Sequence, residues 1–212
     1  TTEAFSRAGV ERERAALIAD AFVQTDLLGF HSHGLLRVPQ NLHWISRGAT
    51  RVSGEPRVLG DRGAVINADA AYLAGALTLD WAIRHGVERA RAHGVAILTI
   101  RRSQHVGALA PFLLRIAEQG YPVFAMVSTP EESLVTVEGA RSPLFSTNPF
   151  GFAFPTDGAP LLLDMSLAVT AAGKVRMAAR ERRALPGEWI VDAAGKLSSD
   201  PRALDTGALL PI

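Results

Sequence analysis

Cysteine is absent from the 212 residues of this chain. Its absence excludes disulfides, a thiol nucleophile, and zinc or iron–sulfur sites that are built on cysteine. It also fits a cytoplasmic protein, because disulfides are rare in that reducing environment.

An excess of charge of one sign is lacking too. The chain has 22 Lys and Arg residues against 21 Asp and Glu residues, which gives a formal net charge of +1. This balance gives no electrostatic reason to expect nucleic acid or an anionic membrane as a partner. No apolar run reaches the roughly 18 residues of a membrane helix, and we expect no signal peptide.

A further missing feature is the GxGxxG fingerprint that follows the first strand of a standard Rossmann fold. What remains is an ordinary globular composition, with 48% apolar and 20% charged residues. A chain of 212 residues is long enough for one large domain or two small ones. The sequence stops within the apolar run that ends at Ile212, so we expect the C-terminal part to be incomplete.

Hydrophobic periodicity predicts helices that alternate with strands. Helices are expected over residues 8–28, 39–48, 73–93 and 109–119, and strands over 57–59, 64–68, 95–100, 123–128 and 161–166. The alternation predicts an α/β fold, a mixed sheet with flanking helices. The continuous apolar runs at 95–100 and 161–163 are typical of buried strands. Without a linker or a repeat, we expect one continuous unit over 1–212, with a helical part at about 1–50 and a core at about 51–212.

Chemical groups concentrate in the stretch Gly29–Pro39. A span of seven residues contains a hydroxyl, two imidazoles and a guanidinium, those of Ser32, His31, His33 and Arg37. Histidine is the usual proton carrier near neutral pH, and arginine matches a carboxylate with its planar fork. The stretch can therefore hold a small organic acid through Arg37 and supply a proton from His33. A solvated loop, a decorated helix end and a metal site at His31 and His33 are the alternatives.

Further polar residues follow the predicted strands, where α/β enzymes collect their chemistry. His105 follows strand 95–100 and is a candidate site residue. The alternative is a loop histidine that is hydrogen-bonded to backbone. Asp164 follows three leucines, where a carboxylate is costly to bury unless it is paired. Pairing with His33 would fix the imidazole tautomer. The loop glutamates Glu131, Glu132 and Glu138 are expected to be solvated.

Ser32–Arg37 resembles the SHGxxR signature of the malate/L-lactate dehydrogenase family, which includes ureidoglycolate dehydrogenase, diketogulonate reductase and cyclic imino-acid reductases. Later stretches resemble other family elements in the same order: HxG at His105–Gly107, GTNPxxxxxP at Ser146–Pro155, GK at Gly173–Lys174 and PxxWxxDxxG…TDP at Pro186–Pro201. The chain departs from the family pattern at Ser146, which replaces glycine, at 137–139 and at 166–168.

The resemblance implies a malate/L-lactate dehydrogenase-like fold that is not a standard Rossmann fold. It implies an NAD(P)-dependent oxidoreductase, with NAD or NADP as cofactor, that acts on a small 2-oxo or 2-hydroxy acid or a cyclic 2-imino acid. His105–Leu109 and 139–145 favour a pyrroline- or piperideine-2-carboxylate reductase over a malate, lactate or ureidoglycolate dehydrogenase. A homodimer is also implied.

The same resemblance assigns the site residues. The catalytic residues would be His33, Ser32, Asp164 and His105; the substrate-binding residues Arg37, Thr147 and Asn148; and the cofactor-binding residues His105, Gly107, Thr129, Asp164, Met165, Ser166 and Lys174. Lys174 can instead be an ordinary solvated lysine. The alternative for Thr147 and Asn148 is a purely structural role in a tight turn. Two other classes stay open: a metal-dependent hydrolase using His31, His33 and Asp164, and a non-catalytic acid-binding domain.

Overall fold

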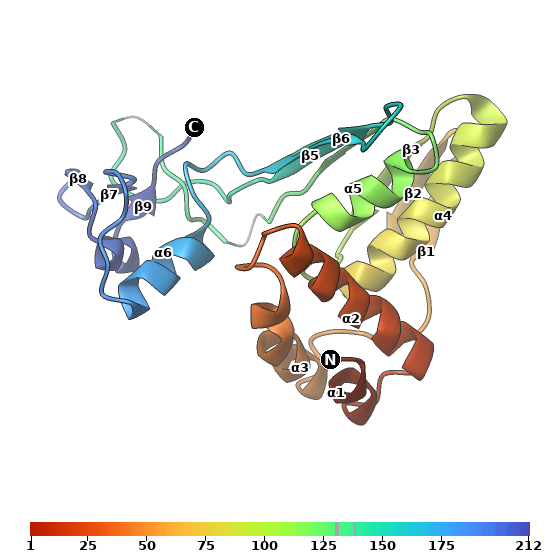
Figure 1. Cartoon of the computed structure of the whole chain (residues 1–212), viewed down its shortest axis with the longest axis horizontal. Helices are drawn as coiled ribbons and strands as arrows, with labels where there is room; N and C mark the ends of the chain where they lie inside the picture. Colours follow the sequence, from red (N-terminus) through yellow and green to blue (C-terminus); the bar gives the residue numbers. More distant parts are fainter. Residues whose placement is uncertain (130–131, 138) are drawn as a thin grey trace. The chain divides into compact units, whose positions relative to one another are not determined.

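The computed structural model describes residues 1–129, 132–137 and 139–212, so that Glu131 and Glu138 lie outside the described residues. Glu132 is exposed, as expected. Contacts divide the chain into two compact units, residues 1–123 with 153–162 and residues 124–152 with 163–212 (Figure 1). The expectation of one continuous unit over 1–212 stays a prediction.

The first unit begins with a group of helices. They are α1 (Thr2–Arg7), α2 (Arg12–Leu27), the short 3-10 helix η1 (Leu35–Arg37) and α3 (Val38–Ser46). The helix expected over 8–28 therefore starts four residues later, because the chain turns at Gly9, whose φ of 86° suits glycine. The rings of Phe5 and Phe22 stack 6.1 Å apart and join α1 to α2. No helix within the described ranges is long and apolar enough to cross a membrane.

A mixed three-stranded sheet completes this part of the first unit. Its strands are β1 (Arg57–Arg62), β2 (Val65–Asp69) and β3 (Ile97–Arg101), in the order β1-β2-β3. β1 and β2 are antiparallel, whereas β2 and β3 are parallel and are joined through α4 (Gly75–His93). Gly94, in the left-handed conformation, ends α4 as the sequence predicts. α5 (Ala110–Ala117) follows, and the expected α/β arrangement is confirmed.

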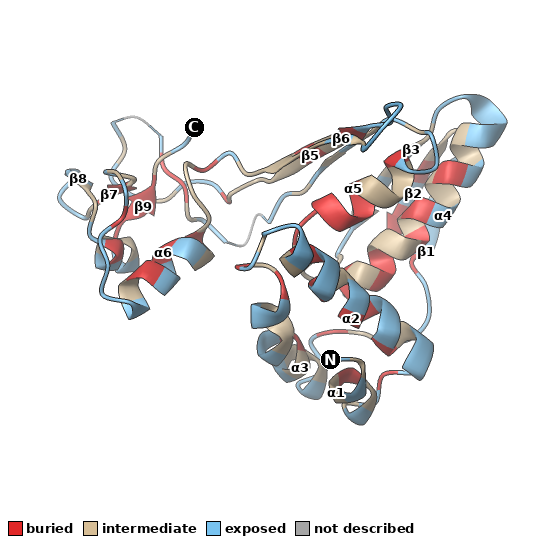
Figure 2. Ribbon diagram, viewed as in Figure 1, coloured by how far each residue is buried: buried red, intermediate tan, exposed pale blue. Residues whose placement is uncertain are grey.

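One core joins the N-terminal helices to the residues that follow them. Buried side chains of α1 and α2 pack with Leu73 and Leu77 around the start of α4. A second cluster places Trp81 of α4 against Ile66 of β2. Buried residues recur along α4 as red bands in Figure 2. The helical part expected at about 1–50 therefore shares its core with the segment after residue 50.

The prediction that strand 95–100 is buried was wrong for one of its faces. Val95 and Ile97 are 54% and 53% exposed, whereas Leu98 and Ile100 are half-buried against the Ile66 and Trp81 cluster. Side chains alternate between the faces of a strand, and α4 covers only one face of β3. Leu161 is likewise 58% exposed, so the second apolar run is not fully buried either.

The second unit has a core of its own. Val175, Ile190 and Leu209 are fully buried in it. Its elements are α6 (Ala172–Arg180), the sheet β8-β7-β9 with strands Leu197–Ser198, Ile190–Val191 and Ala208–Leu209, and η2 (Pro201–Asp205). A further sheet, in the order β4-β5-β6, contains the points where the chain passes between units; its strands are Val123–Met126, Phe150–Phe154 and Leu161–Met165.

Candidate active site

Asp26, near the end of α2, shapes the loop that carries His33. Its Oδ2 accepts a hydrogen bond of 2.9 Å from the backbone N–H of Leu35, and its Oδ1 lies 3.2 Å from Nδ1 of His31. A Cβ atom on Gly34 would fall 2.2 Å from Oδ1 of Asp26. The glycine of the SHGxxR stretch is therefore required by the close approach of this carboxylate.

Within that loop, Ser32 and His33 form a direct pair. The Oγ atom of Ser32 lies 2.8 Å from Nδ1 of His33, and the Ser32 residue is only 4% exposed. A hydroxyl both donates and accepts, so Oγ can serve as partner to Nδ1 with or without its proton. The pair therefore suits an imidazole that gains and loses a proton during a reaction.

Arg37 is held close to the same pair. Its Nε donates a 2.7 Å hydrogen bond to the carbonyl oxygen of Ser32, and its Nη1 donates to Oε1 of Gln40 at 3.0 Å. Asn41 fixes the backbone of Arg37 by donating from Nδ2 to its carbonyl at 2.9 Å. These bonds hold the guanidinium against the backbone of Ser32, the residue whose hydroxyl pairs with His33.

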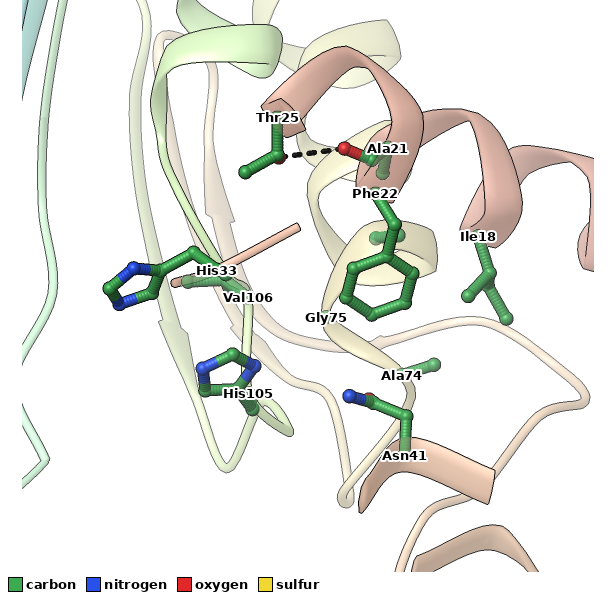
Figure 3. Close-up of a pocket in the computed structure, with 12 residues that line it drawn as sticks. Ile18, Ala21, Phe22, Thr25, His33, Asn41, Ala74, Gly75, His105 and Val106 are labelled. Atoms are coloured by element: carbon green, nitrogen blue, oxygen red, sulfur yellow. Dashed lines mark hydrogen bonds between the residues drawn. The ribbon is translucent and has the colours of Figure 1, made fainter. Parts of the chain in front are cut away.

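His105 lies next to His33 although 72 positions separate them in the chain. The two imidazole rings are parallel within 7°, with centroids 6.3 Å apart (Figure 3). Trp44 of α3 lies on His105 as well, with its ring tilted and 6.0 Å away. The sequence predicted both histidines as site residues, and the structure brings their rings together.

The His105 ring is kept neutral by its surroundings. Burial lowers its pKa to about 4, and the nearby charges of His33 and Arg37 add to the effect. Its Nδ1 atom is buried and has no hydrogen-bond partner among the residues that the structure describes. The alternative of a histidine bonded to backbone through this atom is therefore not what the structure shows.

A small pocket lies against these two rings. Its wall combines α2, α3, the start of α4 and the 105–107 loop; the lining residues are Ile18, Ala21, Phe22, Thr25, His33, Asn41, Ala74, Gly75, Ala76, His105, Val106 and Gly107 (Figure 3). About 20 Å³ of it can contain the centre of a water molecule. Since one water needs roughly 10–15 Å³ by this measure, the pocket has room for water and not for a carboxylate substrate.

Thr147 and Asn148 lie in a tight turn of the second unit. Asn148 has a φ of 37°, a left-handed conformation that asparagine tolerates, and its N–H donates to Oγ of Ser146 at 3.4 Å. The carbonyl of Thr147 accepts from the N–H of Leu167 at 2.9 Å. Both residues thus make local backbone contacts, and Oδ1 of Asn148 is buried without a hydrogen-bond partner among the described residues.

The other expected cofactor residues also belong to the second unit. Asp164 and Met165 end β6 and are half-buried, whereas Thr129 is exposed and Lys174 is exposed in the first turn of α6. The hydroxyl of Ser166 closes a local turn, since it accepts from the N–H of Ala168 at 3.2 Å. The pairing of Asp164 with His33 stays a prediction.

Sequence reasoning missed three contributors to the site. Asp26 carried a signal, because an acid in the last turn of a helix is unfavourable there and suggests a tertiary role. Gly75 is needed because a Cβ atom would fall 2.3 Å from the carbonyl of His105, and Trp44 lies on the same ring. These two are long-range contacts, which the local pattern does not contain.

Within the described ranges, no group of three or more His, Asp or Glu side chains is arranged to hold a metal ion. The hydrolase alternative therefore gains no ligand set from these residues.

The model of the family described as malate/L-lactate dehydrogenase matches residues 1–212. The chain belongs to this family. The resemblance inferred from the SHGxxR stretch and the later motifs is thereby confirmed.

Among curated proteins, two kinds of relative are the most informative. A Delta(1)-pyrroline-2-carboxylate/Delta(1)-piperideine-2-carboxylate reductase of Pseudomonas syringae pv. tomato is 38% identical over 205 residues, 96% of this chain and 59% of the relative. The ureidoglycolate dehydrogenase (NAD(+)) of Escherichia coli (strain K12) is 35% identical over 208 residues, 97% of this chain and 58% of the relative. The chain thus spans about three-fifths of the length of these relatives.

Solved structures give the same fold. The crystal structure of delta1-piperideine-2-carboxylate reductase from Pseudomonas syringae superposes with a TM-score of 0.91 at 36% identity, over 100% of this chain and 64% of that one. A dehydrogenase from Sinorhizobium meliloti superposes with a TM-score of 0.93 at 28% identity, over 100% and 62%. The predicted malate/L-lactate dehydrogenase-like fold is therefore confirmed.

Proposed function

We propose that this member of the malate/L-lactate dehydrogenase family is an NAD(P)-dependent oxidoreductase. It interconverts a small 2-oxo acid or cyclic 2-imino acid with its reduced form. The observation that carries the proposal is the Ser32–His33 pair, with Arg37 bonded to its backbone and the neutral His105 ring parallel to it. This arrangement combines a proton carrier with a carboxylate-binding group in one loop.

In this proposal, each site residue has a separate task. His33 gives a proton to the carbonyl oxygen or imine nitrogen of the substrate, and Ser32 accompanies Nδ1 through the change of protonation state. Arg37 binds the substrate carboxylate through its guanidinium. Asp164 orients His33, and Thr147 and Asn148 contribute polar atoms to the substrate site. Oδ1 of Asn148, which is buried and has no hydrogen-bond partner among the described residues, suits that role.

A nicotinamide cofactor fits the chemistry of His105. The bound nicotinamide would supply the hydride. A ring with a pKa of about 4 is neutral at pH 7, so it does not repel the positive charge of an oxidised nicotinamide. We assign Gly107, which has a φ of 76°, to the same cofactor site as His105. Thr129, Asp164, Met165, Ser166 and Lys174 would hold the remainder of the cofactor.

The substrate that we favour is a cyclic imino acid such as pyrroline- or piperideine-2-carboxylate. Its support is the 38% identity to a reductase named for these two compounds, against 35% to a ureidoglycolate dehydrogenase. A malate-, lactate- or ureidoglycolate-type hydroxy acid is the alternative. We further propose a cytoplasmic homodimer.

The test is the change in nicotinamide absorbance at 340 nm with the purified protein. NADH and NADPH are each offered with piperideine-2-carboxylate, pyrroline-2-carboxylate, pyruvate, oxaloacetate and a diketo sugar acid; ureidoglycolate is offered with NAD and NADP. We expect turnover with a cyclic imino acid, and the better cofactor is then identified directly. Turnover with hydroxy or oxo acids alone would favour the alternative substrate class. Folded protein that is inactive with every pair would contradict the proposal.

A further inference from the structure

The loop that carries His105 is tied to a neighbouring loop where both leave the first sheet. Asp69 ends β2 and lies opposite Arg101, the last residue of β3, in the parallel ladder. Backbone hydrogen bonds of 2.6–3.0 Å continue this pairing beyond the strands, from the N–H of Ala70 to Arg101, of Tyr72 to Arg102, and of Gln104 to Leu73. Residues 70–74 and 101–104 therefore run side by side, joined by backbone hydrogen bonds.

The carboxylate of Asp69 lies where these two segments leave the sheet, and both of its oxygens accept hydrogen bonds. Arg102 donates to it twice, from Nε to Oδ1 at 2.9 Å and from Nη2 to Oδ2 at 2.6 Å. Arg101 donates from Nε to Oδ2 at 3.1 Å, and the N–H of Ala71 donates to Oδ1 at 2.9 Å. Asp69 is only 1% exposed, and the bonds from Arg102 hold its pKa far below the usual range.

The backbone at this junction is strained in both loops. Ala71, Tyr72 and Arg102 have φ angles of 45°, 60° and 55°, which are left-handed values that non-glycine residues rarely adopt. Such conformations persist only where the surroundings hold them, and they concentrate at functional sites. Asp69 bonds directly to two of the three, the N–H of Ala71 and the guanidinium of Arg102. That guanidinium also lies 5.7 Å from the centre of the Tyr72 ring.

The other end of the loop is fixed by packing. Gly75, the first residue of α4, lies against the backbone of His105 and Val106, where a Cβ atom would come within 2.3 and 2.6 Å. Between the two fixed ends, Oε1 of Gln104 accepts from the N–H of His105 at 3.0 Å, and Nε2 of Gln104 donates to the carbonyl of Ala49. These contacts of the loop therefore restrict the position of the His105 ring.

We propose that Asp69 is a positioning residue of the reaction: through Arg101 and Arg102, its carboxylate fixes the loop that holds the His105 ring parallel to His33. The role rests on the proposed function, because it is assigned within that reaction. The geometry itself can be measured without turnover.

The test compares Asp69→Asn with the matched control Asp61→Asn. Asp61 belongs to β1 of the same sheet and makes a similar two-pronged ion pair, with Arg89 at 2.9 and 2.6 Å, but it does not bond to the 101–107 loop. The readout is an NMR titration of the His105 imidazole, assigned with a His105→Gln variant. A third variant, Arg102→Asn, removes the guanidinium at a left-handed position that asparagine tolerates, so it tests the same bonds if Asp69→Asn does not fold.

In the native protein, we expect the His105 ring to titrate near pH 4. In Asp69→Asn and Arg102→Asn, the loosened loop admits water to the ring, and the midpoint moves toward the ordinary value of 6.5. In Asp61→Asn, the midpoint stays at its native value. A native midpoint in both folded variants, Asp69→Asn and Arg102→Asn, would overturn the inference, and so would an equal shift in the control.

Turnover separates this inference from the proposed function. If the protein is active, we expect Asp69→Asn to lower kcat about tenfold to a hundredfold, as misplacement by about 1 Å does. Its KM should stay close to native, and Asp61→Asn should keep both constants. An Asp69→Asn kcat within a factor of two of native would overturn the positioning role. If no variant or native protein turns over, while the midpoint shifts as predicted, the proposed function fails and the control of the His105 loop by Asp69 stands.

Discussion

The contact between Gly34 and Asp26 allows a quantitative prediction for Gly34→Ala. The φ and ψ of Gly34 are −87° and −137°, outside the α and β regions open to alanine, so the substitution adds backbone strain to the steric clash with Asp26. The new Cβ would fall 2.2 Å from Oδ1 and 2.4 Å from Cγ of Asp26, so the carboxylate must move and release the N–H of Leu35.

The lost bond gives the magnitude. A hydrogen bond to a charged group contributes about 1.5–3 kcal/mol. The Asp26 side chain is 24% exposed, so water replaces part of the lost bond and the lower half of that range applies. We expect the clash with Asp26 to lower the free energy of unfolding of Gly34→Ala by about 1.5–2 kcal/mol, in addition to the cost of backbone strain.

A double-mutant cycle identifies the cause. Asp26→Ala removes the acceptor and should cost a similar amount, but it also removes the atoms that the new methyl group meets. In the Asp26→Ala background, Gly34→Ala should cost only its backbone strain, and the part lost is a coupling of about 1.5–2 kcal/mol.

The assay is urea unfolding followed by tryptophan fluorescence. A Trp189→Phe background leaves Trp44 and Trp81, so that the signal reports the first unit alone. Gly86→Ala in α4 is the control, because its Cβ would have its nearest neighbour at an ordinary 3.5 Å. It should stabilise by up to about 1 kcal/mol through helix propensity. Additive effects of Gly34→Ala and Asp26→Ala would refute the steric explanation.

Three other predictions follow from the same structure. His105 binds its proton near pH 4 in the folded protein and near pH 6.5 in the unfolded chain. The free energy of unfolding should therefore fall as the pH drops from 6.5 to 4, by at most about 3 kcal/mol. A His105→Gln variant whose free energy of unfolding, measured in urea, falls equally over this pH range would contradict the prediction. Arg37→Lys should raise the KM for the acid at least tenfold, since lysine lacks the planar fork; an unchanged KM would remove Arg37 from the substrate site. Asp200 accepts from the N–H of Arg202 at the start of η2, so Asp200→Ala should lower the urea midpoint of the second unit, measured by Trp189 fluorescence. An unchanged midpoint would show that the cap is unimportant.

Much of the fold was predictable because its signals are local. The periodicity of residues 73–93 and the following Gly94 predicted α4 closely, and Pro39 marked the start of α3. Burial was less predictable, because the apolar run at 95–100 forms the expected strand but, among the described residues, is packed against neighbours on one face and exposed on the other. The division of the chain near residues 123 and 163 has no signal in composition.

The site was predictable to the extent that its residues are adjacent in sequence. Ser32, His33 and Arg37 stand in one motif, and their contacts follow from that short spacing. The supports of the site come from distant positions: Asp69 reaches Arg102 across 33 residues, and Gly75 meets His105 across 30. Such contacts depend on how the sheet and α4 pack, which a single sequence does not express.

The most direct test of the central claim is to compare the native protein, His33→Gln and His43→Gln in the nicotinamide assay with the best substrate pair. His43 is an exposed histidine on α3 and serves as the matched control. Glutamine keeps polarity but has no proton that it can transfer at working pH, so we expect His33→Gln to lose about a hundredfold or more in kcat while His43→Gln stays native. Equal turnover in His33→Gln and native protein would contradict the assignment of His33 as the proton donor.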